Sequence, residues 1–95
     1  MTLFVMTCLD YEHGLAHRMQ VRERHLAYAA QHADMVKVGG PLLDDAGQMI
    51  GSFLLMEADT RAEIEAFSAA DPYRAEGVFE SVTIHAFRAT VGNLP

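Results

Sequence analysis

Strand-like and helix-like periodicities alternate along this chain of 95 residues, and few topologies accommodate their order. Residues 3–9 are short, apolar and β-prone, which predicts a buried strand. Residues 15–33 repeat apolar or small side chains every three or four positions and are rich in alanine, which predicts a long helix. The inward face of this helix is expected to carry Leu15, Met19, Arg22, Leu26 and Ala29, with His25 at its border.

Four further elements follow the first helix in the order strand, strand, helix, strand. They are predicted at residues 35–38, 50–57, 60–70 and 78–87. The complete order, β-α-β-β-α-β, is the ferredoxin-like arrangement, an antiparallel sheet of four strands with both helices on one face. The other face then lacks a cover although the strands are apolar. Since short chains often gain stability by oligomerising, we expect a homodimer that forms through this open face.

Local signals set the predicted boundaries of these elements. Thr60 and Glu63 form a capping box at the start of the second helix, and Asp71 before Pro72 indicates one further short turn. The run Gly39-Gly40-Pro41 is expected to end any regular structure. We interpret residues 1–95 as one domain, in which residues 91–95 form a flexible tail.

The composition argues against several classes of partner. A formal net charge of -6, with seven basic residues that form no run, does not suit nucleic acid. Neither a leader peptide nor a membrane-spanning segment is recognisable, so we expect a cytoplasmic protein. The lone Cys8 indicates no internal disulfide. His13 and His17 have a helical metal spacing but no evident third ligand, and we expect neither a metal nor an organic cofactor.

His25 and Asp71 are the candidate catalytic residues. Histidine titrates near neutral pH, and an aspartate can fix its tautomer and hold it in place. Each residue also has a structural explanation, since a histidine can simply pack on a helix and aspartate before proline commonly begins one. Arg22, one turn before His25, is compatible with binding an anionic substrate, pairing with Asp71 or lying on the surface.

The glycine-rich segments around residues 40 and 51 suggest places where a ligand approaches the backbone of the sheet. Gly40, Pro41 and Ser52 are therefore candidate substrate-binding residues, although ordinary turn and strand chemistry explains them equally well. Ser52 lacks the flanking glycines of a nucleophile elbow and is not interpreted as a nucleophile.

Taken in order, these motifs resemble the YCII-related (YciI-like) family. The resemblance rests on Arg22-x-x-His25-Leu26, Gly39-Gly40-Pro41, Gly51-Ser52, and Ala70-Asp71-Pro72-Tyr73 with Gly77-Val78-Phe79-Glu80. It implies a subunit of the dimeric α+β barrel superfamily, a histidine–aspartate dyad at His25 and Asp71, and Tyr73 as a further substrate-binding residue. The loop at residues 42–50 is short, so the substrate does not carry over from the resemblance.

Two hypotheses about function remain open. The first is an enzyme of lyase or isomerase type, in which His25 moves a proton on a small, possibly aromatic molecule during elimination, such as dehydrochlorination, or isomerisation. The second is a non-catalytic dimeric module that binds a small molecule or a partner. The second hypothesis predicts that His25 and Asp71 lie too far apart to share a proton.

Overall fold

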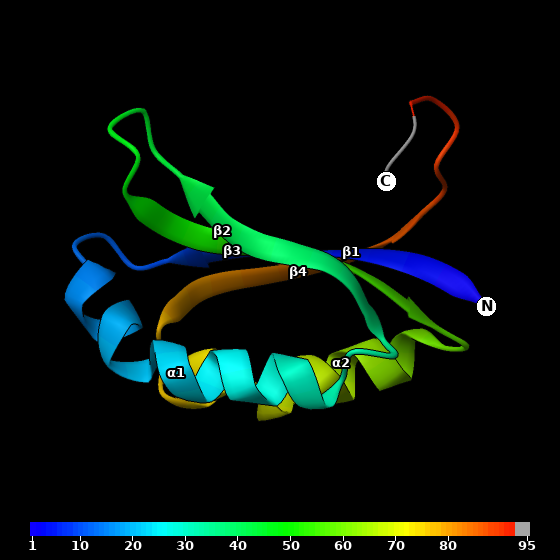
Figure 1. The fold of residues 1–95 in the computed structure, drawn as a ribbon, viewed down its shortest axis with the longest axis horizontal. Coiled ribbons are helices and arrows are strands. Elements are labelled where there is room, and N and C mark those ends of the chain that lie inside the picture. Colours follow the sequence, from blue (N-terminus) through cyan, green and yellow to red (C-terminus); the bar gives the residue numbers. More distant parts are fainter. Residues whose placement is uncertain (93–95) are drawn as a thin grey trace.

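Four strands form one antiparallel sheet in the order β2-β3-β1-β4, and the helices cover one face of it (Figure 1). This computed structural model describes residues 1–92. Its elements are β1 (Thr2–Asp10), α1 (Leu15–Gln31), β2 (Val36–Leu43), β3 (Met49–Ala58), α2 (Arg61–Ala70), α3 (Pro72–Ala75) and β4 (Phe79–Phe87). The predicted ferredoxin-like fold is confirmed. Of the tail predicted at 91–95, residues 93–95 lie outside the described part of the chain.

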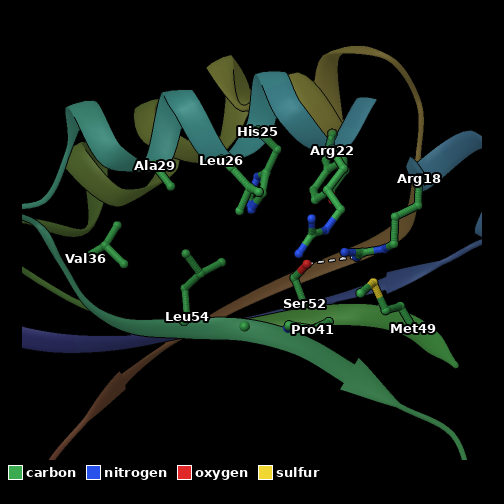
Figure 2. A pocket seen from close by; sticks show the side chains of 13 residues that line it. Arg18, Arg22, His25, Leu26, Ala29, Val36, Pro41, Met49, Ser52 and Leu54 are labelled. Atoms are coloured by element: carbon green, nitrogen blue, oxygen red, sulfur yellow. Dashed lines mark hydrogen bonds between the residues drawn. The ribbon is translucent and has the colours of Figure 1, made fainter. Parts of the chain in front are cut away.

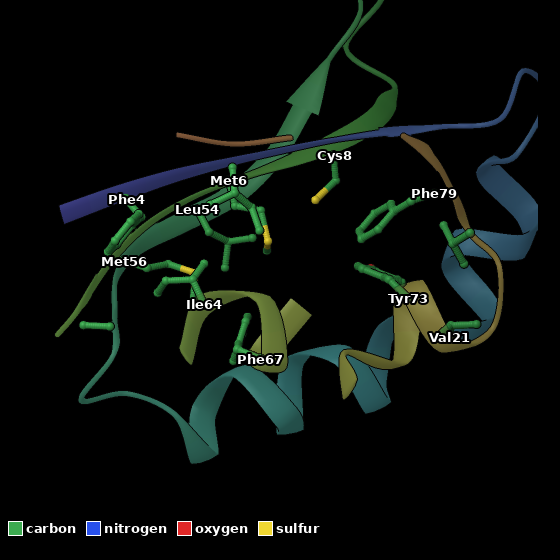
Figure 3. Close-up of a cluster of buried hydrophobic side chains, with 13 residues drawn as sticks. Phe4, Met6, Cys8, Val21, Leu54, Met56, Ile64, Phe67, Tyr73 and Phe79 are labelled. Atoms are coloured by element: carbon green, nitrogen blue, oxygen red, sulfur yellow. The ribbon is translucent and has the colours of Figure 1, made fainter. Parts of the chain in front are cut away.

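The hydrophobic core lies between the sheet and the helices. Every second residue of β1 is buried against the helices, beginning with Phe4, because side chains alternate between the two faces of a strand (Figure 3). From the opposite layer, α2 contributes Ile64 and Phe67, which are three positions apart on one side of the helix. The core therefore holds α2 on the sheet, whereas α1 contributes Val21 to the core and lines a cavity with other residues.

The buried side of α1 is polar, which differs from the sequence-based expectation. Its buried residues are Arg18, Val21 and His25, whereas Met19 and Leu26 are 50% and 47% exposed. The predicted inward face was therefore wrong at Met19, whereas Leu26, although half-exposed, borders a cavity between α1 and the sheet. Hydrophobic periodicity assigns charged residues to solvent, but here charged side chains point inward because they line a cavity.

The segment Gly39-Gly40-Pro41 lies inside β2 and does not end it, so this boundary prediction was wrong. Gly40 is paired with Phe53, and Pro41 with Ser52. Proline is tolerated here because β2 is an edge strand, where a missing N–H group need not break a ladder on both sides. As a result, β2 extends beside the cavity as far as Leu43, and only residues 44–48 remain for the hairpin loop.

Both predicted helix starts are present. The Thr60 hydroxyl accepts a hydrogen bond from the Glu63 amide at 3.4 Å, while the Glu63 carboxylate accepts one from the Asp59 amide at 3.1 Å. At α3, the Asp71 carboxylate accepts a hydrogen bond from the Tyr73 amide at 2.9 Å. Because α3 begins directly after α2, Asp71 is held at the junction of the two helices. None of the helices in residues 1–92 has the length and apolar character needed to cross a membrane.

Candidate functional site

A cavity of about 130 Å³ lies between α1 and the strands β2 and β3 (Figure 2). Tyr73 of α3 also lines it. The residues that line it are Arg18, Arg22, His25, Leu26, Ala29, Val36, Gly39, Gly40, Pro41, Met49, Ser52, Leu54 and Tyr73. Those from α1 recur every three to four positions, so they share one side of the helix. The cavity is thus framed by regular elements, which hold its side chains more firmly than loops would.

His25 and Asp71 are brought into contact at the wall of this cavity. His25 Nδ1 lies 3.0 Å from Asp71 Oδ1 and 3.2 Å from Oδ2. Asp71 is fully buried behind the imidazole, while His25 borders the cavity. The sequence-based prediction that this pair meets is confirmed, and the separation predicted by the non-catalytic hypothesis is not found.

The hydrogen-bond partners of Asp71 determine which ring nitrogen of His25 carries the hydrogen. Oδ1 accepts from the Tyr73 amide, and an ionised carboxylate offers only acceptors, so the hydrogen between Asp71 and His25 belongs on Nδ1. This leaves Nε2 as the unprotonated nitrogen of a neutral imidazole. No group in residues 1–92 forms a hydrogen bond with Nε2, which is therefore available to a ligand in the cavity.

Tyr73 holds the imidazole from the side. The two rings are stacked, with centroids 4.1 Å apart and planes inclined by 19°. Burial raises the pKa of the Tyr73 phenol, and the nearby Arg18 and Arg22 offset only part of this increase. Tyr73 therefore stays neutral at physiological pH and provides a flat wall without adding negative charge.

Arg18 forms a second buried ion pair beside the dyad. Its Nε donates to Asp10 Oδ2 at 2.7 Å, and its Nη2 donates to Asp10 Oδ1 at 3.0 Å. Burial opposes the charged guanidinium, but the Asp10 carboxylate outweighs this effect and raises the pKa of Arg18. Nη2 also donates to Ser52 Oγ at 2.8 Å, and the guanidinium lies 4.4 Å above the centre of the Tyr73 ring. The ion pair thus supports both Ser52 and Tyr73.

Arg22 extends from α1 into the cavity and toward Ser52 (Figure 2). Within residues 1–92, no carboxylate lies within ion-pair distance of its guanidinium, so the pairing with Asp71 considered from the sequence does not occur. The positive charge of Arg22 is therefore available to a ligand.

Every predicted substrate-binding residue borders the cavity, including Gly40, Pro41 and Ser52 on the side of the sheet. Neither Asp10 nor Arg18 is among the site residues predicted from the sequence, although a signal for Arg18 was present. The spacing of Arg18, Arg22 and His25 along α1 carried that signal. No comparable signal marked Asp10, which is the last residue of β1 and lies where the pairing of β1 with β4 shifts register.

Metal ligands do not gather in the described part of the chain. Within residues 1–92, no three His, Cys, Asp or Glu side chains are arranged to hold an ion. The arrangement around the cavity instead offers proton transfer at His25 Nε2 and hydrogen-bond donation from the arginine side.

Comparison with known proteins agrees with this architecture. A structure of 5-chloro-2-hydroxyhydroquinone dehydrochlorinase (TftG) from Burkholderia phenoliruptrix, in complex with 2,5-dihydroxybenzoquinone, is 31% identical with a TM-score of 0.86, and the match covers 93% of this chain and 95% of that one. Two less similar structures share the fold alone. An antibiotic biosynthesis monooxygenase has 8% identity and a TM-score of 0.58, and the match covers 96% of this chain and 100% of that one. A protein of unknown function from Nitrosomonas europaea has 17% identity and a TM-score of 0.57, and the match covers 99% of this chain and 94% of that one.

Sequence comparison identifies the family directly. No curated protein sequence matches the chain significantly. The family model of the YCII-related domain, however, matches residues 2–88, which is nearly the whole chain. The resemblance noted from the ordered motifs is thereby confirmed, and the chain belongs to the YCII-related family.

Proposed function

We propose that this protein is an enzyme that uses His25 as a general base on a small organic molecule bound in the cavity. The observation that carries the proposal is the 3.0 Å contact between His25 Nδ1 and Asp71 Oδ1, with Nε2 left free beside an open cavity. A base positioned in this way contributes on the order of 10²–10⁴ to the rate of a proton transfer. Asp71 orients the imidazole and stabilises the positive charge that forms when Nε2 takes a proton.

The likeness to the dehydrochlorinase supports an elimination as the reaction. The two proteins share their fold, and their sequences are 31% identical over more than nine-tenths of both chains. In such a dehydrochlorination the substrate first takes a keto form, in which the chlorine-bearing carbon also carries a hydrogen. The base then removes a hydroxyl proton, the electron pair moves through the ring to form a C=O and a new C=C bond, and the C–Cl bond breaks to release chloride. Arg22 of α1 and Ser52 of β3 contact the substrate, and Gly40 and Pro41 line the cavity on the side of the sheet.

A homodimer is the second part of the proposal. The face of the sheet away from the helices carries exposed or half-buried apolar side chains, among them Val38, Phe53 and Phe87, which surround a shallow hollow of about 480 Å³. Burying such a face against a second copy removes apolar surface from water and stabilises a chain of this size. The resemblance to the dimeric α+β barrel superfamily supports this arrangement, because in such dimers two sheets pack face to face.

The test of the catalytic proposal is chloride release from 5-chloro-2-hydroxyhydroquinone. We expect the wild-type protein to release chloride and His25→Asn to be slower by about 10² or more. His13→Asn is the matched control, because His13 is exposed and has a positive φ of 62°, which asparagine tolerates well. Equal rates of chloride release for His25→Asn and the wild type would show that His25 is not the base.

A binding module without catalysis is the competing function. It is favoured by the structural duties of the dyad, since Asp71 begins α3 and His25 stacks on Tyr73. It predicts a wild-type protein that binds 2,5-dihydroxybenzoquinone but releases no chloride from the chlorinated compound. Chloride release that depends on His25 excludes it.

A further inference from the structure

The buried ion pair of Arg18 and Asp10 is hydrogen-bonded to the Ser52 hydroxyl, which lines the cavity. The two side chains are only 2% and 3% exposed, so water does not compete for their hydrogen bonds. The carboxylate holds the guanidinium through two bonds, at 2.7 and 3.0 Å, which fixes its plane. In that plane Nη2 directs one further N–H group at Ser52 Oγ, 2.8 Å away.

This third bond determines the direction in which Ser52 can donate. A serine hydroxyl has one hydrogen and two lone pairs, whereas a guanidinium has donors only. Because Arg18 occupies a lone pair of Oγ, the hydroxyl hydrogen must find an acceptor elsewhere. None of residues 1–92 accepts it, and Ser52 lines the cavity, so the hydrogen is free to donate into the cavity.

Arg22 adds a positive charge beside this hydroxyl. Its guanidinium reaches toward Ser52 from α1 (Figure 2), and no carboxylate of the described chain compensates it. Neither Asp10 nor Asp71 lines this cavity: the Asp10 carboxylate is bonded to Arg18, and Asp71 is buried behind His25. A ligand therefore meets one free cation from α1 and one hydroxyl donor from β3, and no carboxylate of residues 1–92 lines the cavity.

We infer that Ser52 and Arg22 together bind a negatively charged oxygen of the substrate, and that Arg18 is the positioning residue that keeps Ser52 a donor. The inference rests on the proposed function for the reaction at His25 and adds the class of molecule that the site selects. A cavity of about 130 Å³ is close in size to cavities of about 150 Å³ that hold benzene. The ligand is thus a single-ring molecule with an ionised oxygen, and a neutral analogue of the same shape binds less tightly.

Binding of two matched quinones measures this selectivity. The first is 2,5-dihydroxybenzoquinone, whose hydroxyl groups are ionised at neutral pH because each is a vinylogous carboxylic acid. The second is 2,5-dimethylbenzoquinone, in which neutral methyl groups replace them. Isothermal titration calorimetry is done in the His25→Asn background, so that neither turnover nor the dyad contributes. We expect the ionised quinone to bind at least about tenfold more tightly, as one charge-assisted hydrogen bond predicts.

Single variants identify the residues responsible. In that background, Ser52→Ala and Arg22→Gln should each weaken the ionised quinone by about ten- to a hundredfold and leave the dimethyl quinone unchanged. Arg18 has a structural role as well, since its guanidinium stacks on Tyr73, so a loss of affinity in Arg18→Lys is not sufficient by itself. The informative measurement is a double-mutant cycle between Arg18→Lys and Ser52→Ala.

The double-mutant cycle shows whether Arg18 acts by positioning Ser52 or only by stabilising the site as a whole. If Arg18 acts through Ser52, Ser52→Ala has little further effect once Arg18→Lys is present. Additive losses overturn the positioning role, and urea unfolding shows whether each variant is folded. Should Arg18→Lys fail to fold, Ser52→Thr serves in its place, because it keeps a hydroxyl and should retain the preference that Ser52→Ala loses.

Failure of this inference can be told from failure of the proposed function. Equal affinity for both quinones, or no binding of either at millimolar concentration, overturns the inference even when the wild-type enzyme releases chloride. Selective binding of the ionised quinone that depends on Ser52 and Arg22 supports the inference even when no chloride is released, and then only the acid–base function is lost.

Discussion

The imidazole of His25 lies nearly parallel to the ring of Tyr73, with centroids 4.1 Å apart. Tyr73 follows Asp71 by only two residues, and its amide donates to the same carboxylate oxygen that lies nearest His25. One short turn of chain therefore supplies both the acceptor that orients the imidazole and the surface that holds its plane. A single tightly hydrogen-bonded segment positions the base more accurately than two independent loops would.

Removing the Tyr73 ring should destabilise the fold as well as release His25. Tyr73 is 1% exposed, stacks on His25 and lies beneath the guanidinium of Arg18. We expect Tyr73→Ala to lower the free energy of unfolding by about 3–5 kcal/mol, as measured by urea denaturation. Tyr73→Phe keeps the ring and should cost much less. Similar losses in both variants would show that the hydroxyl matters more than the stacking.

Replacing Asp71 by asparagine should separate its two duties. Asparagine still caps α3, but its amide can donate to Nδ1 and so move the imidazole hydrogen to Nε2, where no base remains. We expect kcat to fall by about 10²–10⁴ with little change in KM, whereas the free energy of unfolding falls less than in Asp71→Ala. Steady-state kinetics and urea unfolding provide both readouts. Wild-type turnover by Asp71→Asn would contradict the tautomer assignment.

Gly51 should be intolerant of a side chain, and Gly40 provides the comparison. A Cβ atom at Gly51 would collide with the carbonyl oxygen of Cys8, which belongs to the backbone of the neighbouring strand and cannot move alone. At Gly40 a Cβ atom meets nothing within 4 Å. Thermal unfolding should therefore show a large loss of Tm for Gly51→Ala and almost none for Gly40→Ala. A tolerant Gly51→Ala would mean that β1 and β3 can separate there.

The proposed dimer predicts a strong effect of charge on the open face of the sheet. Sedimentation velocity at micromolar concentration should give a dimer for the wild type and a monomer for Val38→Lys, since Val38 borders the apolar hollow and is 48% exposed. Met19→Lys is the matched control, because Met19 is equally exposed but lies on α1. A dimer that survives Val38→Lys would place the interface on another surface.

The Cys8 thiol should make stability fall at alkaline pH. Burial raises its pKa from 9.0 to about 12, so the folded chain keeps the thiol proton in a range where the unfolded chain has lost it. The unfolded state then binds fewer protons, and the free energy of unfolding decreases between pH 9 and pH 12 and is unaffected by Cys8 below pH 9.

Urea unfolding on both sides of pH 9 checks this effect. Cys8→Ala should show a shallower decrease than the wild type, although the raised pKa values of Tyr28 and Tyr73 leave part of it. The same burial predicts that iodoacetamide alkylates Cys8 slowly until the protein unfolds. Identical pH dependence in Cys8→Ala and the wild type would show that the thiol titrates normally.

Local sequence signals determined much of this protein. The order of apolar periodicities predicted the ferredoxin-like sheet, and the motifs at Thr60 and Asp71 predicted where α2 and α3 begin, because caps are chemistry between residues close in the chain. The family resemblance predicted His25 and Asp71 as a pair, and the topology, which leaves both helices on one face of the sheet, is compatible with their contact.

Only the tertiary structure decided what the rest of the site contains. The inward position of Arg18 depends on Asp10, and the two meet because a strand end and a helix start pack together across a loop. Burial of an arginine is stable only when such a partner is present, and no periodicity in the chain records that partner. Likewise, Gly39-Gly40-Pro41 could join a strand only because β2 lies at the edge of the sheet. The order of the strands in the sheet is a property of the assembled fold and is not encoded in this local segment.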